Sequence, residues 1–154
     1  MALRKLICKA VLEARGFKPR NFDEGDYLRS NFGVTMKYIL LIYSDENAWT
    51  ESELQQCYAK SLQLTQELQA NNQYLGASPL HSIATATSIR VRDGKKLVTD
   101  GPFAETREQL GGYFLIDAKD LDEAIAIAAR IPSASKGTVE IRPIVELSGL
   151  PSDQ

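Results

Sequence analysis

From residue 36 onward, the apolar positions of the chain switch between a strand-like and a helix-like spacing. Residues 37–43 read Lys-Tyr-Ile-Leu-Leu-Ile-Tyr and are apolar at both odd and even positions, which predicts a strand covered on both faces. Thr50 followed by Glu53 forms a capping box and predicts the start of a helix. The expected core stripe of this helix, at helical spacing, is Leu54, Cys57, Tyr58, Leu62, Thr65 and Leu68.

The rest of the chain continues this alternation of strands and helices. Asp93-Gly94 between two alternating segments predicts a β-hairpin. Asp120 and Glu123 form a cap pair that predicts a second helix, with aspartate in place of the usual hydroxyl residue. The expected elements are a short extended segment (74–81), the two hairpin segments (85–92 and 95–99), a strand (113–116), a helix (121–130) and a last strand (138–146).

The order of these elements predicts a fold of the α+β class. The split βαβ arrangement of ferredoxin-like folds has this order: strand, helix, strand with an inserted hairpin, strand, helix and strand. Its helices cover one face of the sheet only, yet the strands at 37–43 and 113–116 are apolar on both faces. Because a large bare apolar face is unusual for a soluble monomer, we expect a second copy to cover it in a twofold homodimer, a dimeric α+β barrel. The alternative is that residues 1–35 fold back over this face and cover it.

The first 35 residues differ from the rest of the chain. They carry a net charge of +3, whereas residues 36–154 carry −5. Apolar residues at helical spacing lie among basic ones in residues 3–11, and no small-residue cleavage site follows, so we do not interpret the segment as a signal peptide. Two interpretations stay open: a short docking helix, or residues upstream of a natural start at Met36. We assign 36–148 to one domain and 149–154 to a C-terminal tail.

Composition narrows the functional classes. The acidic main domain argues against a nucleic-acid ligand. No run of about 18 apolar residues occurs, so we expect no membrane association and a cytoplasmic protein. The chain has two cysteines and one histidine, too few for a disulfide framework and for a multi-histidine or thiolate metal site within one chain. We therefore expect no metal and no cofactor. Cys57 is expected to be a small buried apolar residue.

Three residues are candidates for acid–base chemistry. Asp100 ends a predicted strand and precedes Gly101, so it could act as a general base, or it could cap its own turn. If Glu105 lies close to Asp100, the pKa of one of these two carboxyl groups would be raised, which allows acid–base chemistry. Alternatively, the Glu105 carboxylate could satisfy backbone N–H groups at the start of a helix. His81 would complete a base–orienter pair if its ring faced Asp100, and otherwise it is a surface residue.

Six further residues are candidates for ligand binding. Arg90 and Arg142 alternate with apolar neighbours, so they leave the other sheet face, where each could hold an anion or form a structural ion pair. Pro102 keeps the preceding residue out of helical geometry, which predicts a loop over 100–108. The other four candidates are Gly101, Pro102 and Phe103 in this loop, and Tyr43, which is otherwise a core or interface aromatic. Gly111-Gly112 is interpreted as a bulge or a close strand approach rather than a phosphate loop.

The motif at residues 98–118, VTDGPFAETREQLGGYFLIDA, resembles the signature of the DGPF (DGPFAETKE) subgroup of YCII-related proteins. Similar segments are MKYILLIYSDE (36–46), ATSIRVRDGKKL (86–97) and LDEAIAIAARIP (121–132). Arg107 stands where the motif usually has lysine, and residues 1–35 lie outside the pattern. The resemblance implies a dimeric barrel of ferredoxin-like halves. Related proteins have a histidine–aspartate pair, but their histidine lies on the first helix, where this chain has none.

Two functional hypotheses follow. The first is a small-molecule site between barrel and hairpin, with Asp100, Glu105 and His81 as acid–base groups and Arg90 as an anion holder. The second is a non-catalytic accessory protein that binds a regulatory protein partner. The resemblance favours a regulatory context, because genes of this subgroup often lie beside genes for sigma factors of the extracytoplasmic type.

Overall fold

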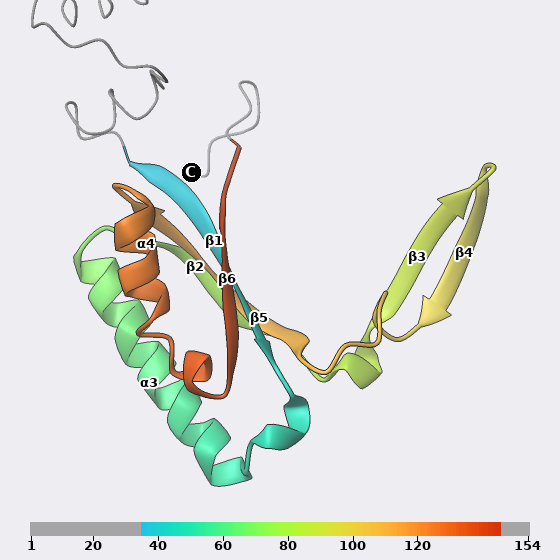
Figure 1. Ribbon diagram of the computed structural model, residues 1–154, viewed down its shortest axis with the longest axis horizontal. Helices are drawn as coiled ribbons and strands as arrows, with labels where there is room; N and C mark the ends of the chain where they lie inside the picture. Colours follow the sequence, from blue (N-terminus) through green and yellow to red (C-terminus); the bar gives the residue numbers. More distant parts are fainter. Residues whose placement is uncertain (1–34, 146–154) are drawn as a thin grey trace, which may run out of the picture. The chain divides into compact units, whose positions relative to one another are not determined.

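The computed structural model describes residues 35–145, and the chain divides into two units between Thr35 and Met36 (Figure 1). The expectations about the N-terminal segment and the C-terminal tail lie outside the described residues. The strands are β1 (Met36–Ser44), β2 (Tyr74–Pro79), β3 (Thr87–Arg92), β4 (Lys95–Asp100), β5 (Gln109–Ala118) and β6 (Gly137–Pro143). The helices are α3 (Glu51–Ala70) and α4 (Leu121–Ala128), with short 3-10 turns η1 (Glu46–Ala48), η2 (Ile83–Thr85) and η3 (Pro132–Ser135).

Four strands form an antiparallel sheet in the order β2-β5-β1-β6. Figure 1 shows α3 and α4 lying side by side on the same face of this sheet. The expected α+β class is therefore confirmed, with antiparallel sheets and two helices in an arrangement consistent with a ferredoxin-like fold. The dimeric barrel stays a prediction. Within residues 35–145, no helix is long and apolar enough to cross a membrane.

The core lies between the two helices and the sheet. Leu40 on β1, Ile116 on β5, Leu68 on α3 and Ile131 after α4 have essentially no exposed surface. The expected capping box of α3 is present, because the Thr50 hydroxyl accepts a hydrogen bond from the Glu53 N–H and the Glu53 carboxylate accepts one from the Thr50 N–H. These contacts fix where α3 begins.

The second helix is capped in a modified way. The Asp120 side chain accepts a hydrogen bond from the Glu123 N–H at 2.8 Å, as expected. The Glu123 carboxylate, however, accepts from the Lys119 N–H at 2.7 Å rather than from that of Asp120. The sequence therefore identified the cap residue correctly but not the reciprocal partner.

The predicted core stripe of α3 is wrong in part. Cys57 and Leu68 are buried, but Leu54, Tyr58 and Leu62 are 36%, 45% and 60% exposed. Leu64, which the stripe omitted, is buried instead. The physical reason is that Leu54, Tyr58 and Leu62 border a cavity between α3 and the sheet instead of packing against the sheet.

The other sheet face carries the second set of apolar side chains. Ile39, Leu41 and Tyr43 on β1 alternate with the buried residues, and Leu115 lies opposite Ile39 on β5. All four are partly exposed, and among residues 35–145 no helix lies over them.

Two glycine positions confirm the interpretation of residues 111–112. The register between β1 and β5 shifts so that Ile42 faces Gly112 and Tyr43 faces Leu110, which leaves Gly111 as the extra residue of a β-bulge. A Cβ on Gly112 would lie 2.9 Å from the Ser78 carbonyl oxygen, so a glycine permits the close approach of β2.

Candidate functional site

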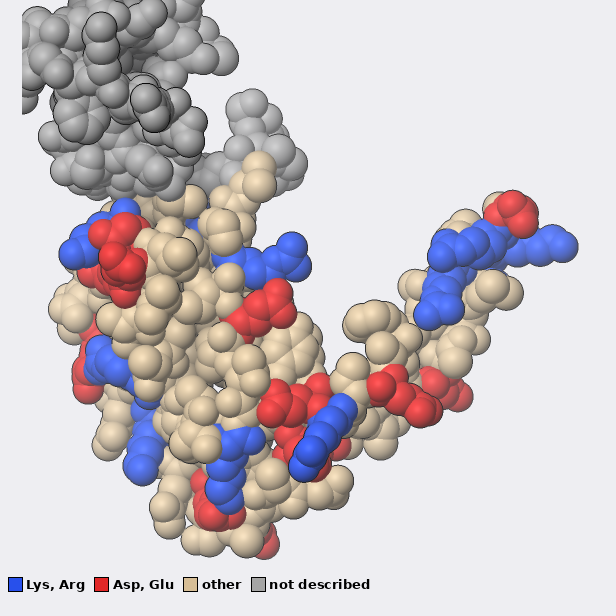
Figure 2. Space-filling model, in the orientation of Figure 1, with Lys and Arg blue, Asp and Glu red and all other residues tan. Residues whose placement is uncertain are grey.

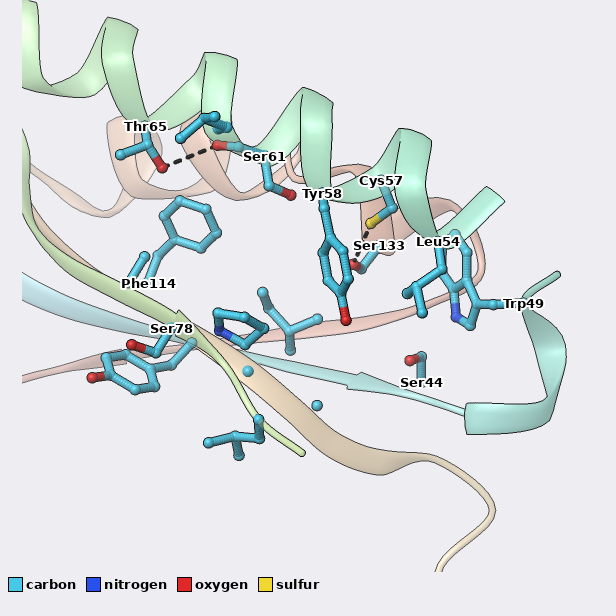
Figure 3. A pocket seen from close by; sticks show the side chains of 18 of the residues that line it. Ser44, Trp49, Leu54, Cys57, Tyr58, Ser61, Thr65, Ser78, Phe114 and Ser133 are labelled. Carbon is cyan, nitrogen blue, oxygen red and sulfur yellow. Dashed lines mark hydrogen bonds between the residues drawn. The ribbon is translucent and has the colours of Figure 1, made fainter. Parts of the chain in front are cut away.

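A cavity of about 720 Å³ lies between residues 51–65 of α3 and the sheet (Figure 3). Its floor comes from β1, β2 and β5, its roof from α3, and its ends from η1 and η3. The Gly111 bulge and the close approach at Gly112 both fall in its lining, so the local irregularity of β5 shapes the floor.

The walls combine apolar and hydroxyl-bearing side chains. Ile42, Phe114, Tyr74 and Leu54 supply apolar surface. Figure 3 shows the ring of Tyr58 extending from α3 towards the sheet, with its hydroxyl group at the end nearer the sheet. Further hydroxyl groups line the cavity from several elements: Ser44, Ser61, Thr65, Ser78, Ser82 and Ser133. An apolar pocket with a few converging polar groups is the usual form of a small-molecule site.

The charged side chains that line the cavity are all acidic. No lysine, arginine or histidine is among its lining residues, and the two charged side chains are Glu46 and Glu51. Glu46 is held at the rim by two hydrogen bonds, accepted from the Ser82 hydroxyl at 2.9 Å and from the Ile83 N–H at 2.8 Å. Two carboxylates without a basic side chain in the same lining would repel an anion.

One wall is braced by Lys136, the residue that follows η3. The Lys136 ammonium donates to the Glu53 carboxylate at 2.6 Å and to the Ala48 carbonyl at 2.9 Å, and it lies 5.1 Å from the centre of the Trp49 ring. The hydrogen bond from Lys136, together with those from Thr50, lowers the pKa of Glu53 from 4.5 to about 2. This network holds the Trp49 indole as part of the cavity wall.

Cys57 is buried, as expected, and its thiol lies 3.3 Å from the Ser133 hydroxyl across the roof (Figure 3). This contact joins α3 to η3. Within residues 35–145, no group of three or more His, Cys, Asp or Glu side chains is placed to hold a metal ion.

The three predicted acid–base residues lie outside this cavity. Asp100 is the last residue of β4 and pairs with Thr87, Glu105 is in the following loop, and His81 lies between β2 and η2. All three are exposed, and the described residues include no hydrogen bond among them. Their proposed cooperation stays a prediction from the sequence.

The predicted ligand-binding residues fall into two groups. Around the hairpin, the Arg90 guanidinium donates to the Phe103 carbonyl at 3.5 Å, and the Phe103 ring is 82% exposed. Gly101 has φ = +98°, so the expected non-helical geometry before Pro102 is confirmed. On the sheet, Tyr43 and Arg142 lie on the face away from the helices, where the Arg142 guanidinium is 3.8 Å from the Glu140 carboxylate.

The sequence predicts a packed core stripe for most of the cavity residues on α3, Thr65 included, and does not single out Ser61. Ser61 and Thr65 are four residues apart on the inner side of the helix, and the Thr65 hydroxyl donates to the Ser61 carbonyl at 3.0 Å. Hydroxyl residues interrupting an apolar stripe were the available signal, since a fully packed helix face has no need of them.

Comparison with known proteins agrees with this fold. The model of the YCII-related domain matches residues 36–148, which is most of the chain. The chain is also similar to an uncharacterized protein of Rhizobium meliloti (strain 1021), with 37% identity over 121 residues that cover 71% of this chain and 92% of that protein. On these matches, the chain belongs to the family of proteins with a YCII-related domain.

Proposed function

We propose that this chain binds a small molecule in the cavity between α3 and the sheet, and that it does so as a homodimer. The observation that carries the proposal is the cavity itself, about 720 Å³ in volume and built from apolar walls and hydroxyl groups. Small-molecule sites typically have volumes of about 300–1,000 Å³ and this kind of lining. Assignment to the DGPF subgroup, which rests on the motif at 98–118, is part of the same proposal.

The ligand that fits is neutral or cationic, with an apolar body and a few polar groups. Phe114 and Tyr74 offer flat surfaces for an apolar or aromatic body. Tyr58, Ser61 and Ser78 offer hydroxyl groups that both donate and accept hydrogen bonds. An anion would meet Glu46 or Glu51 without any basic partner in the lining.

Acid–base catalysis by Asp100, Glu105 and His81 is a separate and finer proposal. It requires these exposed side chains to act on a molecule held near the loop at 100–105, with Arg90 binding an anionic group of that molecule. The cavity supports binding without requiring this chemistry, so the two ideas are tested separately.

The homodimer is supported by the sheet face away from the helices. Ile39, Leu41 and Leu115 form an apolar strip there, and two sheets packed through such faces bury it from water. Replacing Leu41 with lysine would place a charge in that interface. We expect the solution mass of this variant to fall from twice the chain mass to the chain mass; an unchanged mass would contradict this interface.

The test of the cavity is a thermal-shift and titration panel on the full chain. The panel contains sets of compounds matched in size and differing in charge: neutral, cationic and anionic. Ser61→Leu fills the cavity from the roof, and Gln66→Leu is the matched control, because Gln66 is exposed on the same helix. We expect neutral or cationic binders whose affinity falls at least tenfold in Ser61→Leu and is unchanged in Gln66→Leu. Binding that survives Ser61→Leu would refute the proposed site.

The second candidate function, an accessory protein that binds a regulatory partner, is favoured by one observation. The β3–β4 hairpin exposes several apolar side chains that a foreign protein could cover. Capture of a sigma factor by the full chain, in the absence of any small-molecule binding, would favour this candidate.

A further inference from the structure

The β3–β4 hairpin is an uncovered element in the described part of the chain. It forms a two-stranded sheet of its own and does not pair with the four-stranded sheet. Of its twelve strand residues, Ser88 alone is partly buried, and the other eleven are exposed. An isolated two-stranded hairpin is at best marginally stable in water, so it needs a surface to pack on.

The two faces of the hairpin differ in character. Cross-strand partners share a face, and the register pairs Ile89 with Val98 and Val91 with Lys96. Ile89, Val91 and Val98 are 61%, 60% and 56% exposed, so this face is a bare apolar strip. The opposite face pairs Arg90 with Leu97 and is mostly polar or basic.

The base of the hairpin is fixed rather than loose. The Gly101 N–H donates to the Ala86 carbonyl at 2.7 Å, and the Ser88 hydroxyl donates to the Gly101 carbonyl at 2.7 Å. The segment leading into the hairpin is bound to Glu46 at the cavity rim through Ser82 and Ile83. The hairpin is therefore held as an arm with a defined root.

Charge favours a second copy of this chain as the cover. Residues 87–100 hold four basic and two acidic side chains, a net charge of +2, whereas the rest of residues 36–145 holds seven basic and twelve acidic ones, a net charge of −5. Figure 2 shows the basic side chains gathered towards the free end of the hairpin. A basic arm and an acidic body on every copy are complementary between two copies.

The cavity mouth offers the matching apolar surface. Leu54, Tyr58, Leu62 and Leu80 line the cavity and are 36–60% exposed, with the acidic Glu46 and Glu51 in the same lining. The arm is also long enough, because six strand residues span about 20 Å, twice the spacing of about 10 Å between sheets packed face to face. An arm from one sheet therefore reaches past the partner's sheet to its helix layer.

We propose that the β3–β4 arm of one copy packs its Ile89–Val91–Val98 face over the cavity mouth of a second copy, so that each site is closed by its partner. Twofold symmetry makes the exchange reciprocal, since each copy gives one arm and receives one. The inference rests on the proposed function, which supplies the homodimer and the cavity, and adds that each cavity is incomplete without the partner.

Disulfide trapping between singly substituted full-length chains tests the exchange. Val91→Cys chains are mixed with Leu62→Cys chains and oxidised mildly, so that a link between the two new thiols joins two copies. Leu97→Cys is the matched control on the opposite face of the arm, with 52% exposure against 60% for Val91. Wild-type chains give the background from Cys8 and Cys57.

We expect the Val91→Cys and Leu62→Cys mixture to give at least tenfold more linked pair than the Leu97→Cys and Leu62→Cys mixture. Equal yields from both mixtures, or no linked pair above background, overturn the inference. If ligand binding and its loss in Ser61→Leu persist without the link, the arm exchange fails and the proposed cavity stands. Capture of a foreign protein by the arm in place of the link likewise overturns the inference.

Discussion

Replacing Leu68 with alanine tests how tightly the C-terminal half of α3 packs on the sheet. Leu68 has no exposed surface and lies in the core formed by both helices and the sheet. Leucine-to-alanine changes at such sites cost about 2.7–5 kcal/mol, and the cost rises with the volume left empty. Because two helices and a sheet surround Leu68, little collapse is possible, and we expect a loss of about 3–4 kcal/mol in the free energy of unfolding.

Leu54 provides the matched change on the same helix. It is 36% exposed and lines the cavity, so its truncation enlarges an existing space instead of creating a new one. We expect a loss of about 1 kcal/mol, from the covered part of the side chain alone. Urea unfolding at one chain concentration, followed by far-UV circular dichroism and by the fluorescence of the single tryptophan, Trp49, measures both values. Equal losses for the two variants would mean that the N-terminal half of α3 is packed and the cavity closed.

Two further predictions concern the frame around the site. Gly137→Ala places a Cβ against the Tyr43 carbonyl oxygen, a backbone atom that cannot rotate away. We therefore expect the free energy of unfolding, measured by thermal unfolding, to fall by about 3 kcal/mol. Gly111→Ala is the control, because its Cβ meets no atom within 4 Å. The Lys136 hydrogen bond, the first cause of the shift, helps to lower the pKa of Glu53 from 4.5 to about 2. The ionised Glu53 carboxylate therefore contributes fully to stability above pH 4.5, and this contribution is lost as the pH falls towards 2. Glu53→Gln should flatten the fall of the melting temperature over that range, and an unchanged slope would contradict the assignment.

Local chemistry made much of the fold predictable. The Thr50 capping box, the Asp120 cap and the Asp93-Gly94 hairpin depend on residues within a few positions of one another, and each was found where it was expected. The run of apolar residues at 37–43 correctly identified β1. These features were accessible because neighbours in sequence determine them.

The cavity was not predictable by the same reasoning. Its lining joins Ser44, Tyr58, Ser78 and Ser133, which are distant in the chain and come together only in the folded domain. Helical periodicity identifies a face but not how far that face lies from the sheet, so periodicity alone predicts a core position for Leu62, which is 60% exposed. The loop at 100–105 was the most distinctive stretch of sequence, yet its side chains lie outside the cavity.

Crystals of the full chain soaked with a fragment library test the cavity most directly. We predict that neutral and cationic fragments gather between α3 and the sheet, with their polar atoms near Tyr58 and Ser78. Fragments that bind only beside Asp100 and Glu105, in crystals where α3 closes against the sheet, would contradict the account.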